Sequence, residues 1–178
     1  VAGYANFPSA HGSNTDGIVM EAYYLGSTPG NTGLLAHEMG HYLGLYHTFQ
    51  GGCTNNDCLL DGDRVCDTPP DNSTQWVPCK TQVANTCTTD SQSGFATDQN
   101  DMILNFMDYT NFNCFNDFTL GQSVRMNAAI TTTRASLLAS KACFDPCPAV
   151  PVIAAFTPAG ATIQVGIGTI AAAVLEGL

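Results

Sequence analysis

Three histidines and one glutamate lie within eleven residues, in the run HEMGHYLGLYH at positions 37–47. His37 and His41 are four residues apart, so on a helix they share one face with Cβ atoms roughly 5–6 Å apart. His47 lies six residues beyond His41, on the opposite face if the helix continued. Gly44 has no Cβ and enters the left-handed conformation readily, so we expect the helix to end there. The pattern predicts a helix, a turn and three imidazoles around one cation.

Glu38 is expected beside this cation, because it sits about 100° round the helix axis from His37. Three neutral imidazoles at about 2.0–2.1 Å leave one position of a zinc ion open for water. The Glu38 carboxylate can accept a proton from that zinc-bound water, so we predict it to be a general base. Three ordinary core histidines are the alternative, but three of the four histidines fall at ligand spacing. The fourth, His11, is expected to be an ordinary surface residue.

The composition argues against nucleic acid as a partner. The chain has 178 residues, which is room for one domain with its own core, and a formal net charge of −10. This charge repels nucleic acid and anionic membranes.

Eight cysteines, an even number, are scattered through sequence typical of loops. Such usage indicates disulfides and an oxidising compartment. Zinc binding by cysteine is the alternative, but the chain has no pair of Cys-x-x-Cys motifs. A glycosylation sequon at residues 72–74 also favours an extracellular setting. We therefore predict a secreted protein.

Residues 1–7 and 18–25 are rich in β-branched and aromatic residues, so we predict two strands around the turn-forming residues 8–17. Asn31 or Thr32 is expected to cap the histidine-bearing helix, which runs to about Leu43. Residues 50–100 have no sustained period, and we expect disulfide-bonded loops there.

Thr119 and Gln122 have the spacing of a capping box, which predicts the start of a second long helix. We expect its apolar stripe to pack beneath the cleft. The stripe consists of Leu120, Val124, Ala128, Thr131, Ala135 and Leu138.

Four aspartates, Asp61, Asp63, Asp67 and Asp71, lie in one Gly/Pro-rich segment. Carboxylates are the hard oxygen ligands that calcium takes. The segment lacks the spacing and the closing glutamate of an EF-hand, so these residues alone favour an ordinary solvated acidic loop.

The histidine motif, together with several other segments, resembles the metzincin peptidases. Within that class the chain is most similar to the pappalysin family. The segment Asn105 to Thr110, NFMDYT, resembles the methionine turn of the class. The other matching stretches are Gly3-Tyr4-Ala5 to Pro8, LYHTF at 45–49, GDRVCDTP at 62–69, FTLGQ at 118–122, and Arg125 with Met126. The resemblance spans most of residues 3 to 134.

This resemblance implies an α+β fold and a secreted zinc-dependent endopeptidase. The expected domain, residues 1–147, has a twisted mixed sheet with a zinc helix, followed by an irregular disulfide-bonded part with the methionine turn and a C-terminal helix. Family members have further strands before the segment matching Gly3, so the domain is expected to be incomplete at its N-terminus. The expected strand at 18–25 would flank the cleft at the sheet edge, where an extended peptide adds itself by main-chain hydrogen bonds.

The resemblance also implies roles for individual residues. His37, His41 and His47 would bind zinc, with Met107 as an apolar floor below it. Tyr109 would approach the zinc and stabilise the transition state.

By the same resemblance Asp63 and Thr68 would bind a structural calcium ion, which reverses the preference for a solvated loop. Cys53 would pair with Cys87 and Cys79 with Cys114, leaving Cys58 with Cys66 and Cys143 with Cys147.

Residues 148–178 lie outside the resemblance and carry one charge, at Glu176. Prolines, glycines and Gln164 interrupt this apolar segment, so we do not expect a membrane span, and its role is left open.

We predict a protein or peptide substrate and make no prediction of oligomeric state. Two alternatives remain: a non-catalytic, zinc-stabilised binding module, and a zinc hydrolase acting on a small amide or ester. The intact Glu38 favours the peptidase.

Overall fold

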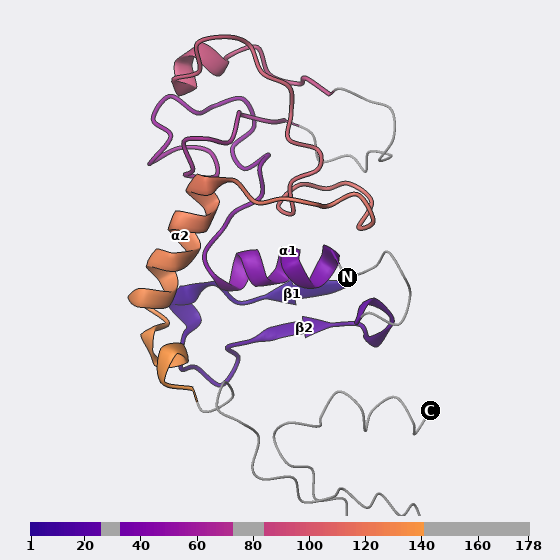
Figure 1. Ribbon diagram of the computed structural model, residues 1–178, viewed down its shortest axis with the longest axis vertical. Coiled ribbons are helices and arrows are strands. Elements are labelled where there is room, and N and C mark those ends of the chain that lie inside the picture. Colours follow the sequence, from indigo (N-terminus) through magenta and orange to yellow (C-terminus); the bar gives the residue numbers. More distant parts are fainter. Residues whose placement is uncertain (26–32, 73–83, 141–178) are drawn as a thin grey trace, which may run out of the picture. The chain divides into compact units, whose positions relative to one another are not determined.

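The computed structural model describes residues 1–25, 33–72 and 84–140 (Figure 1). The chain divides into two compact units, Val1–Ala135 and Ser136–Leu178. Of the second unit only residues 136–140 are described, and residues 135–139 form a 3-10 turn. The predicted boundary between residues 147 and 148 lies outside the described residues and stays a prediction. None of the described helices is both long enough and apolar enough to cross a bilayer.

The first unit begins with two short antiparallel strands, β1 (Gly3–Ala5) and β2 (Ile18–Met20), in which Tyr4 pairs with Val19. Both predicted strands are confirmed, although each is shorter than predicted. Residues 22–24 form a 3-10 turn, which ends the second strand early. Within the described residues the sheet is purely antiparallel, so the mixed sheet implied by the resemblance is not seen there. The helix α1 (Gly33–Tyr42) lies against both strands (Figure 1).

The end of α1 follows the prediction made for Gly44. This glycine has a φ of 94°, and its N–H donates to His41 O at 2.9 Å. The Leu45 N–H reaches back to Gly40 O, also at 2.9 Å, which completes a Schellman motif. The chain therefore reverses directly after the helix and buries Leu45 completely. Both residues predicted to cap the other end, Asn31 and Thr32, lie outside the described residues.

Residues 45–72 and 84–118, here together called the loop region, have almost no regular structure. Their one described helical element is the 3-10 turn Asp90–Ser93. Two predicted disulfides are confirmed, Cys53–Cys87 and Cys58–Cys66. Cys114 is also disulfide-bonded. Its expected partner Cys79 lies outside the described residues, as do Cys143, Cys147, and Ser73 and Thr74 of the sequon.

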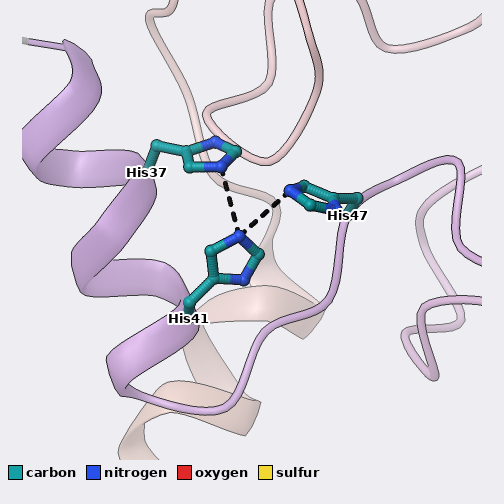
Figure 2. Close-up of side chains that lie close together, drawn as sticks. All are labelled: His37, His41 and His47. Atoms are coloured by element: carbon teal, nitrogen blue, oxygen red, sulfur yellow. Dashed lines mark hydrogen bonds between the residues drawn. The ribbon is translucent and has the colours of Figure 1, made fainter. Parts of the chain in front are cut away.

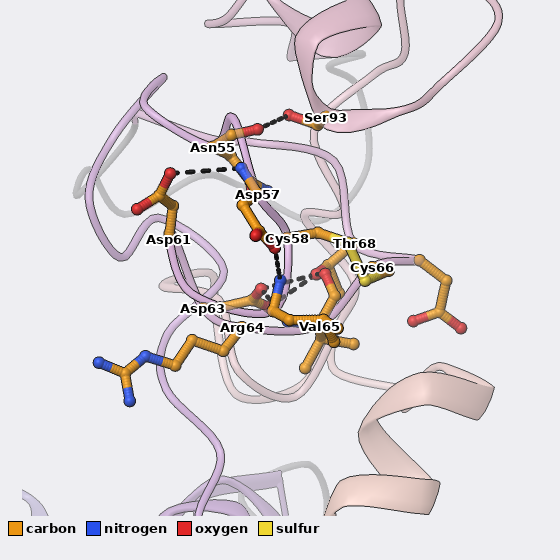
Figure 3. Close-up of a disulfide and its surroundings, with 12 residues drawn as sticks. Asn55, Asp57, Cys58, Asp61, Asp63, Arg64, Val65, Cys66, Thr68 and Ser93 are labelled. Carbon is orange, nitrogen blue, oxygen red and sulfur yellow. Dashed lines mark hydrogen bonds between the residues drawn. A yellow bond between two sulfur atoms is a disulfide. The ribbon is translucent and has the colours of Figure 1, made fainter.

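The interior of the loop region is built largely from polar side chains. Several of them bond to backbone groups: the Ser93 hydroxyl donates to Asn55 O at 2.8 Å (Figure 3), and the Thr89 hydroxyl donates to Cys53 O at 2.9 Å. Such bonds satisfy backbone groups that no helix or sheet pairs. The buried polar residues of this region include Asn55, Asp63, Thr68, Asp71, Asp90, Ser93, Asp101, Asn105, Asp108 and Thr110.

The second long helix, α2 (Leu120–Thr131), begins with the predicted capping box. Gln122 N–H donates to the Thr119 hydroxyl at 3.1 Å, and Thr119 N–H donates to Gln122 Oε1 at 2.9 Å. The carboxylate of Asp67 adds a further acceptor, for Gly121 N–H at 2.8 Å.

The predicted buried stripe of α2 is wrong, because its six residues are all exposed. Leu120 and Val124 are 78% and 63% exposed, and Ala135 and Leu138 belong to the separate 3-10 turn. The buried face is instead set by hydrogen bonds, from Gln122 to Asn105 and from Arg125 Nε to Gly44 O at 2.8 Å. These polar contacts orient the helix more strongly than its apolar pattern does.

Arg134 joins the end of the first unit to its beginning. It is fully buried, and its guanidinium donates to Tyr42 O at 2.7 Å, Asn6 O at 3.0 Å and Asp16 Oδ2 at 2.8 Å. One side chain therefore fixes the C-terminal end of α1 against the segment that follows β1.

Candidate metal centre

The three histidines of the motif meet at one point (Figure 2). His41 Nε2 lies 3.1 Å from His37 Nε2 and 3.1 Å from His47 Nε2. Two of the rings come from α1, and the third follows the turn at Gly44. Among the described residues this is the only group in which three metal-ligating side chains come together.

The donor set fits a zinc ion. Ligand nitrogens that lie 2.0–2.1 Å from one tetrahedral zinc are separated by about 3.3 Å, close to the spacing found here. Burial and mutual repulsion lower the pKa of His37 to about 4 and of His47 to about 3. Burial also lowers the pKa of His41. All three rings are therefore neutral near pH 7, with lone pairs available for a metal.

Backbone carbonyl groups orient two of the three rings. His37 Nδ1 lies 2.6 Å from Phe106 O, and His41 Nδ1 lies 2.8 Å from Leu45 O. A carbonyl accepts only from a protonated nitrogen, so both rings carry their proton on Nδ1 and direct the Nε2 lone pair to the centre.

Glu38 faces the same space without binding the centre. It is 4% exposed, and burial raises its pKa to about 7. Its Oε2 is buried and has no hydrogen-bond partner among the described residues. Gly3 on β1 leaves room for this carboxylate, since a Cβ there would lie 3.0 Å from Glu38 Oε1. The carboxylate thus lines the same cavity as the three histidines.

A cavity of about 490 Å³ opens onto the three histidines. The strand along it is β1, so the expectation that the second strand flanks the cleft is wrong. The reason is the order of the hairpin: β2 pairs with one edge of β1, and the cavity is lined by β1 itself. The lining comprises Val1, Gly3, Tyr4, Ala5, Phe7, His37, Glu38, His41, Tyr46, His47, Gln50 and Tyr109.

Met107 and Tyr109 both lie close to the histidines. Met107 is completely buried against α1, where a Cβ on Gly40 would overlap its sulfur. The Met107 carbonyl accepts from Thr48 N–H at 3.1 Å, next to His47. The Tyr109 ring centre lies 4.7 Å from that of His47. Burial and the nearby Glu38 raise the Tyr109 pKa.

A buried amide pair supports this part of the site, and sequence reasoning missed it. Asn105 Nδ2 donates to Gln122 Oε1 at 2.8 Å, and Gln122 Nε2 donates to Asn105 Oδ1 at 3.0 Å. Asn105 Oδ1 also accepts from Met107 N–H at 2.9 Å. The pair therefore joins the capping box of α2 to the segment that presents Phe106 O to His37. Its only signal in the sequence is two amide residues with no pattern between them.

The four aspartates considered for calcium have different surroundings, and Figure 3 shows two of them, Asp61 and Asp63. Asp63 accepts from the Thr68 hydroxyl at 2.7 Å and from Val65 N–H at 3.0 Å, and burial raises its pKa to about 7. The other three take part in separate contacts: Asp61 accepts from Asp57 N–H, Asp67 from α2 and Asp71 from the Thr86 hydroxyl. Asp63 and Thr68 thus lie together, whereas the other three aspartates bond to different groups.

The fold and the histidine site together place the chain in a metzincin-like class. Solved structures agree with this: mature mirolysin of Tannerella forsythia in complex with a cleaved peptide matches with a TM-score of 0.54 and 30% identity. That match covers 73% of this chain and 47% of mirolysin. A second structure, mirolysin with a small compound, gives a TM-score of 0.55.

Residues 1–131 match the family model Peptidase_M43, described as pregnancy-associated plasma protein-A. The chain therefore belongs to this pappalysin family. Curated relatives include an extracellular metalloprotease of Verticillium alfalfae, 40% identical over 146 residues, and one of Colletotrichum graminicola, also 40% identical over 146 residues. Each alignment covers 75% of this chain but 45% and 47% of the relative. The chain thus spans about half the length of these proteins.

Proposed function

We propose that this chain is the metal-binding part of a secreted zinc-dependent endopeptidase. One observation carries the proposal: three imidazole Nε2 atoms converge in a cavity that also holds the buried carboxylate of Glu38, whose Oε2 has no hydrogen-bond partner among the described residues. Membership of the pappalysin family supports the same reaction class. A purely structural zinc site has no need of such a carboxylate beside it.

His37, His41 and His47 would hold the zinc through their Nε2 atoms. When bound, zinc supplies a Lewis acid that polarises a peptide carbonyl and lowers the pKa of nearby water to about 7. Glu38 Oε2 takes a proton from the attacking water and then returns it to the departing amine. Its desolvated position suits this task, because burial raises the pKa of the carboxyl towards neutrality, where it both accepts and donates.

The walls of the cavity position the substrate. β1 runs along the cavity and offers backbone groups to an extended peptide, which would add to this strand by main-chain hydrogen bonds. Tyr109, which lines the same cavity as Glu38, would direct its hydroxyl to the negative charge that develops on the carbonyl oxygen. Met107 would form the apolar floor of the site, as in a methionine turn.

The extracellular setting rests on two observations. The curated relatives are named extracellular metalloproteases. The chain itself forms disulfides, which persist in oxidising compartments. We accordingly propose protein or peptide substrates met outside the cell. The mirolysin structure that holds a cleaved peptide supports this substrate class.

Two variants test the function, with a denatured protein as substrate. Glu38→Ala should abolish cleavage and retain zinc, whereas His41→Ala should lose both. Glu21→Ala, a change at an exposed glutamate, is the matched control and should leave both unchanged. Cleavage by Glu38→Ala would contradict the assigned base. Zinc uptake without any cleavage by the wild type would favour the binding module, and turnover of small amides or esters alone would favour the third alternative.

Two further assignments stay predictions. The catalytic domain is assigned to residues 1–147, with residues 148–178 unassigned. Calcium is assigned to Asp63 and Thr68, supported by their closeness and burial. Adding calcium to a stripped sample should raise the Tm, and an unchanged Tm would remove this assignment.

A further inference from the structure

The third histidine of the centre lacks the support that the other two have. His37 and His41 each direct Nδ1 to a backbone carbonyl oxygen, at 2.6 Å and 2.8 Å. No described residue accepts a hydrogen bond from His47 Nδ1. His47 also stands beyond the helix, on a segment without regular structure. The contacts that the structure shows for this ring are aromatic, with Phe49, Tyr109 and the other two histidines.

Phe49 covers the face of His47. The two ring centres lie 4.6 Å apart, and the ring planes differ by 12°, which makes them stacked. The Tyr109 ring contacts both of these rings edge to face. Its centre lies 4.7 Å from that of His47 and 4.8 Å from that of Phe49. Stacked and edge-to-face pairs at these separations are the favourable aromatic geometries.

A tight turn brings Phe49 back over His47. Gln50 N–H donates to His47 O at 3.0 Å, which closes the turn. Within it Thr48 is buried, and its N–H donates to Met107 O at 3.1 Å. The backbone is thus fixed on both sides of Phe49, so the ring returns to the same place above the imidazole.

We infer that Phe49 is a positioning residue for His47, fixing by stacking what a carbonyl fixes for the other two ligands. The inference rests on the proposed zinc site and adds a residue to it that touches neither zinc nor substrate. Because stacking restricts the tilt of the ring but not its proton position, His47 is the ligand held least firmly. It should leave the metal first when the centre is weakened.

The expected effect on metal binding is modest and measurable. The free energy that an aromatic pair of this kind contributes corresponds to a change of about 2- to 10-fold in an equilibrium constant. Removing a hydrogen-bond partner of a metal-ligating histidine typically weakens metal binding about 10- to 100-fold. Removing the Phe49 ring should therefore weaken zinc binding less than removing a carbonyl partner would.

The test compares three variants at Phe49 with a matched control. Phe49→Leu and Phe49→Met remove the ring at similar volume, and Phe49→Tyr keeps it. Phe95→Leu makes the same change at another half-buried phenylalanine, outside the cavity lining. Zinc affinity is measured by chelator competition, and the absorption bands of the cobalt-substituted protein report ligand geometry.

Phe49→Leu and Phe49→Met should bind zinc about 2- to 10-fold more weakly. Both should shift the cobalt bands, whereas Phe49→Tyr and Phe95→Leu should match the wild type. Equal zinc affinity and unchanged bands in both ring-deleted variants would overturn the inference. So would an equal loss in Phe49→Tyr, because that variant retains the stacking ring.

The outcome separates this inference from the proposed function. If the wild type takes up no stoichiometric zinc, the zinc peptidase itself fails. If the wild type binds zinc and the Phe49 variants do so equally well, only the role of Phe49 fails. Thermal unfolding of each variant without metal identifies any that do not fold, and the two ring-deleted variants provide independent readings.

Discussion

The two parts of the molecule that supply the metal centre are stabilised in different ways. Residues 1–25 and 33–43 form a hairpin and a helix, held by backbone hydrogen bonds and by the packing of α1 on both strands. The loop region, residues 45–72 and 84–118, is held by disulfides and by buried polar side chains. The first part contributes His37, His41 and Glu38, and the second contributes His47, Tyr109 and the carbonyl that orients His37.

This difference shows how an irregular chain can still hold a ligand accurately. Buried backbone groups outside helices and sheets need partners, and in the loop region side chains provide many of them. Each such bond is specific to one donor and one acceptor. Regular structure distributes stability over many equivalent bonds, whereas the loop region depends on a few individual residues.

The largest effect is expected when a disulfide is removed from the loop region. Cys53→Ala with Cys87→Ala opens a bridge between residues 34 positions apart, which should cost about 4 kcal/mol from chain entropy. The same change at Cys58 and Cys66, 8 positions apart, should cost about 2.5 kcal/mol. Urea unfolding with zinc present measures both. An equal or larger loss for the shorter bridge would contradict the entropic account.

The second test removes one buried amide. Asn105→Ala leaves Gln122 Nε2 buried without its acceptor, which should cost about 1–3 kcal/mol. Asn127→Ala is the control, since this exposed amide bonds only within α2, and it should cost about 0.5 kcal/mol or less. The free energy of unfolding from urea titrations gives both values. Similar losses would mean that the amide pair is not a special support of the loop region.

The third test uses pH to probe the contact that Arg134, which lies beyond α2, makes with Asp16 in the first part. The hydrogen bond from Arg134 outweighs burial and lowers the pKa of Asp16 from 3.8 to about 2. A carboxyl with a lowered pKa in the folded state stabilises it above about pH 4, and this contribution is lost as the pH falls through about 2. Asp16→Asn should therefore lower the Tm at neutral pH.

The Tm difference between wild type and Asp16→Asn should shrink from pH 4 to pH 2, since both proteins share all other titrating groups. Calorimetry across this range measures the difference. A constant difference at every pH would show that Asp16 acts through its shape and not its charge.

The smallest effect is expected on the exposed face of α2. Val124→Ala should change the free energy of unfolding by about 0.5 kcal/mol or less, because the side chain is 63% exposed. A decrease of more than 1 kcal/mol in the free energy of unfolding, measured by urea unfolding, would support the predicted packing of this stripe after all.

The sequence predicted the features that depend on local spacing. The metal-site histidines, the turn at Gly44 and the capping box at Thr119 are each set by residues a few positions apart, and the structure has them. The disulfides Cys53–Cys87 and Cys58–Cys66 came from family resemblance, because eight cysteines alone leave the pairing open. The sequence did not predict the features that depend on distant residues. These are the buried face of α2, the strand that lines the cleft and the pair Asn105–Gln122. Polar contacts between distant segments leave no period to detect.

The Arg134 contacts bear on how the chain folds during synthesis. They join residues 92 and 128 positions apart, at Tyr42 and Asn6. Both acceptors leave the ribosome long before the arginine does, so the strand beside the cleft stays unsecured until almost the whole unit has emerged. A nascent chain therefore carries all three histidines of the motif well before the strand that lines the cleft is fixed in place.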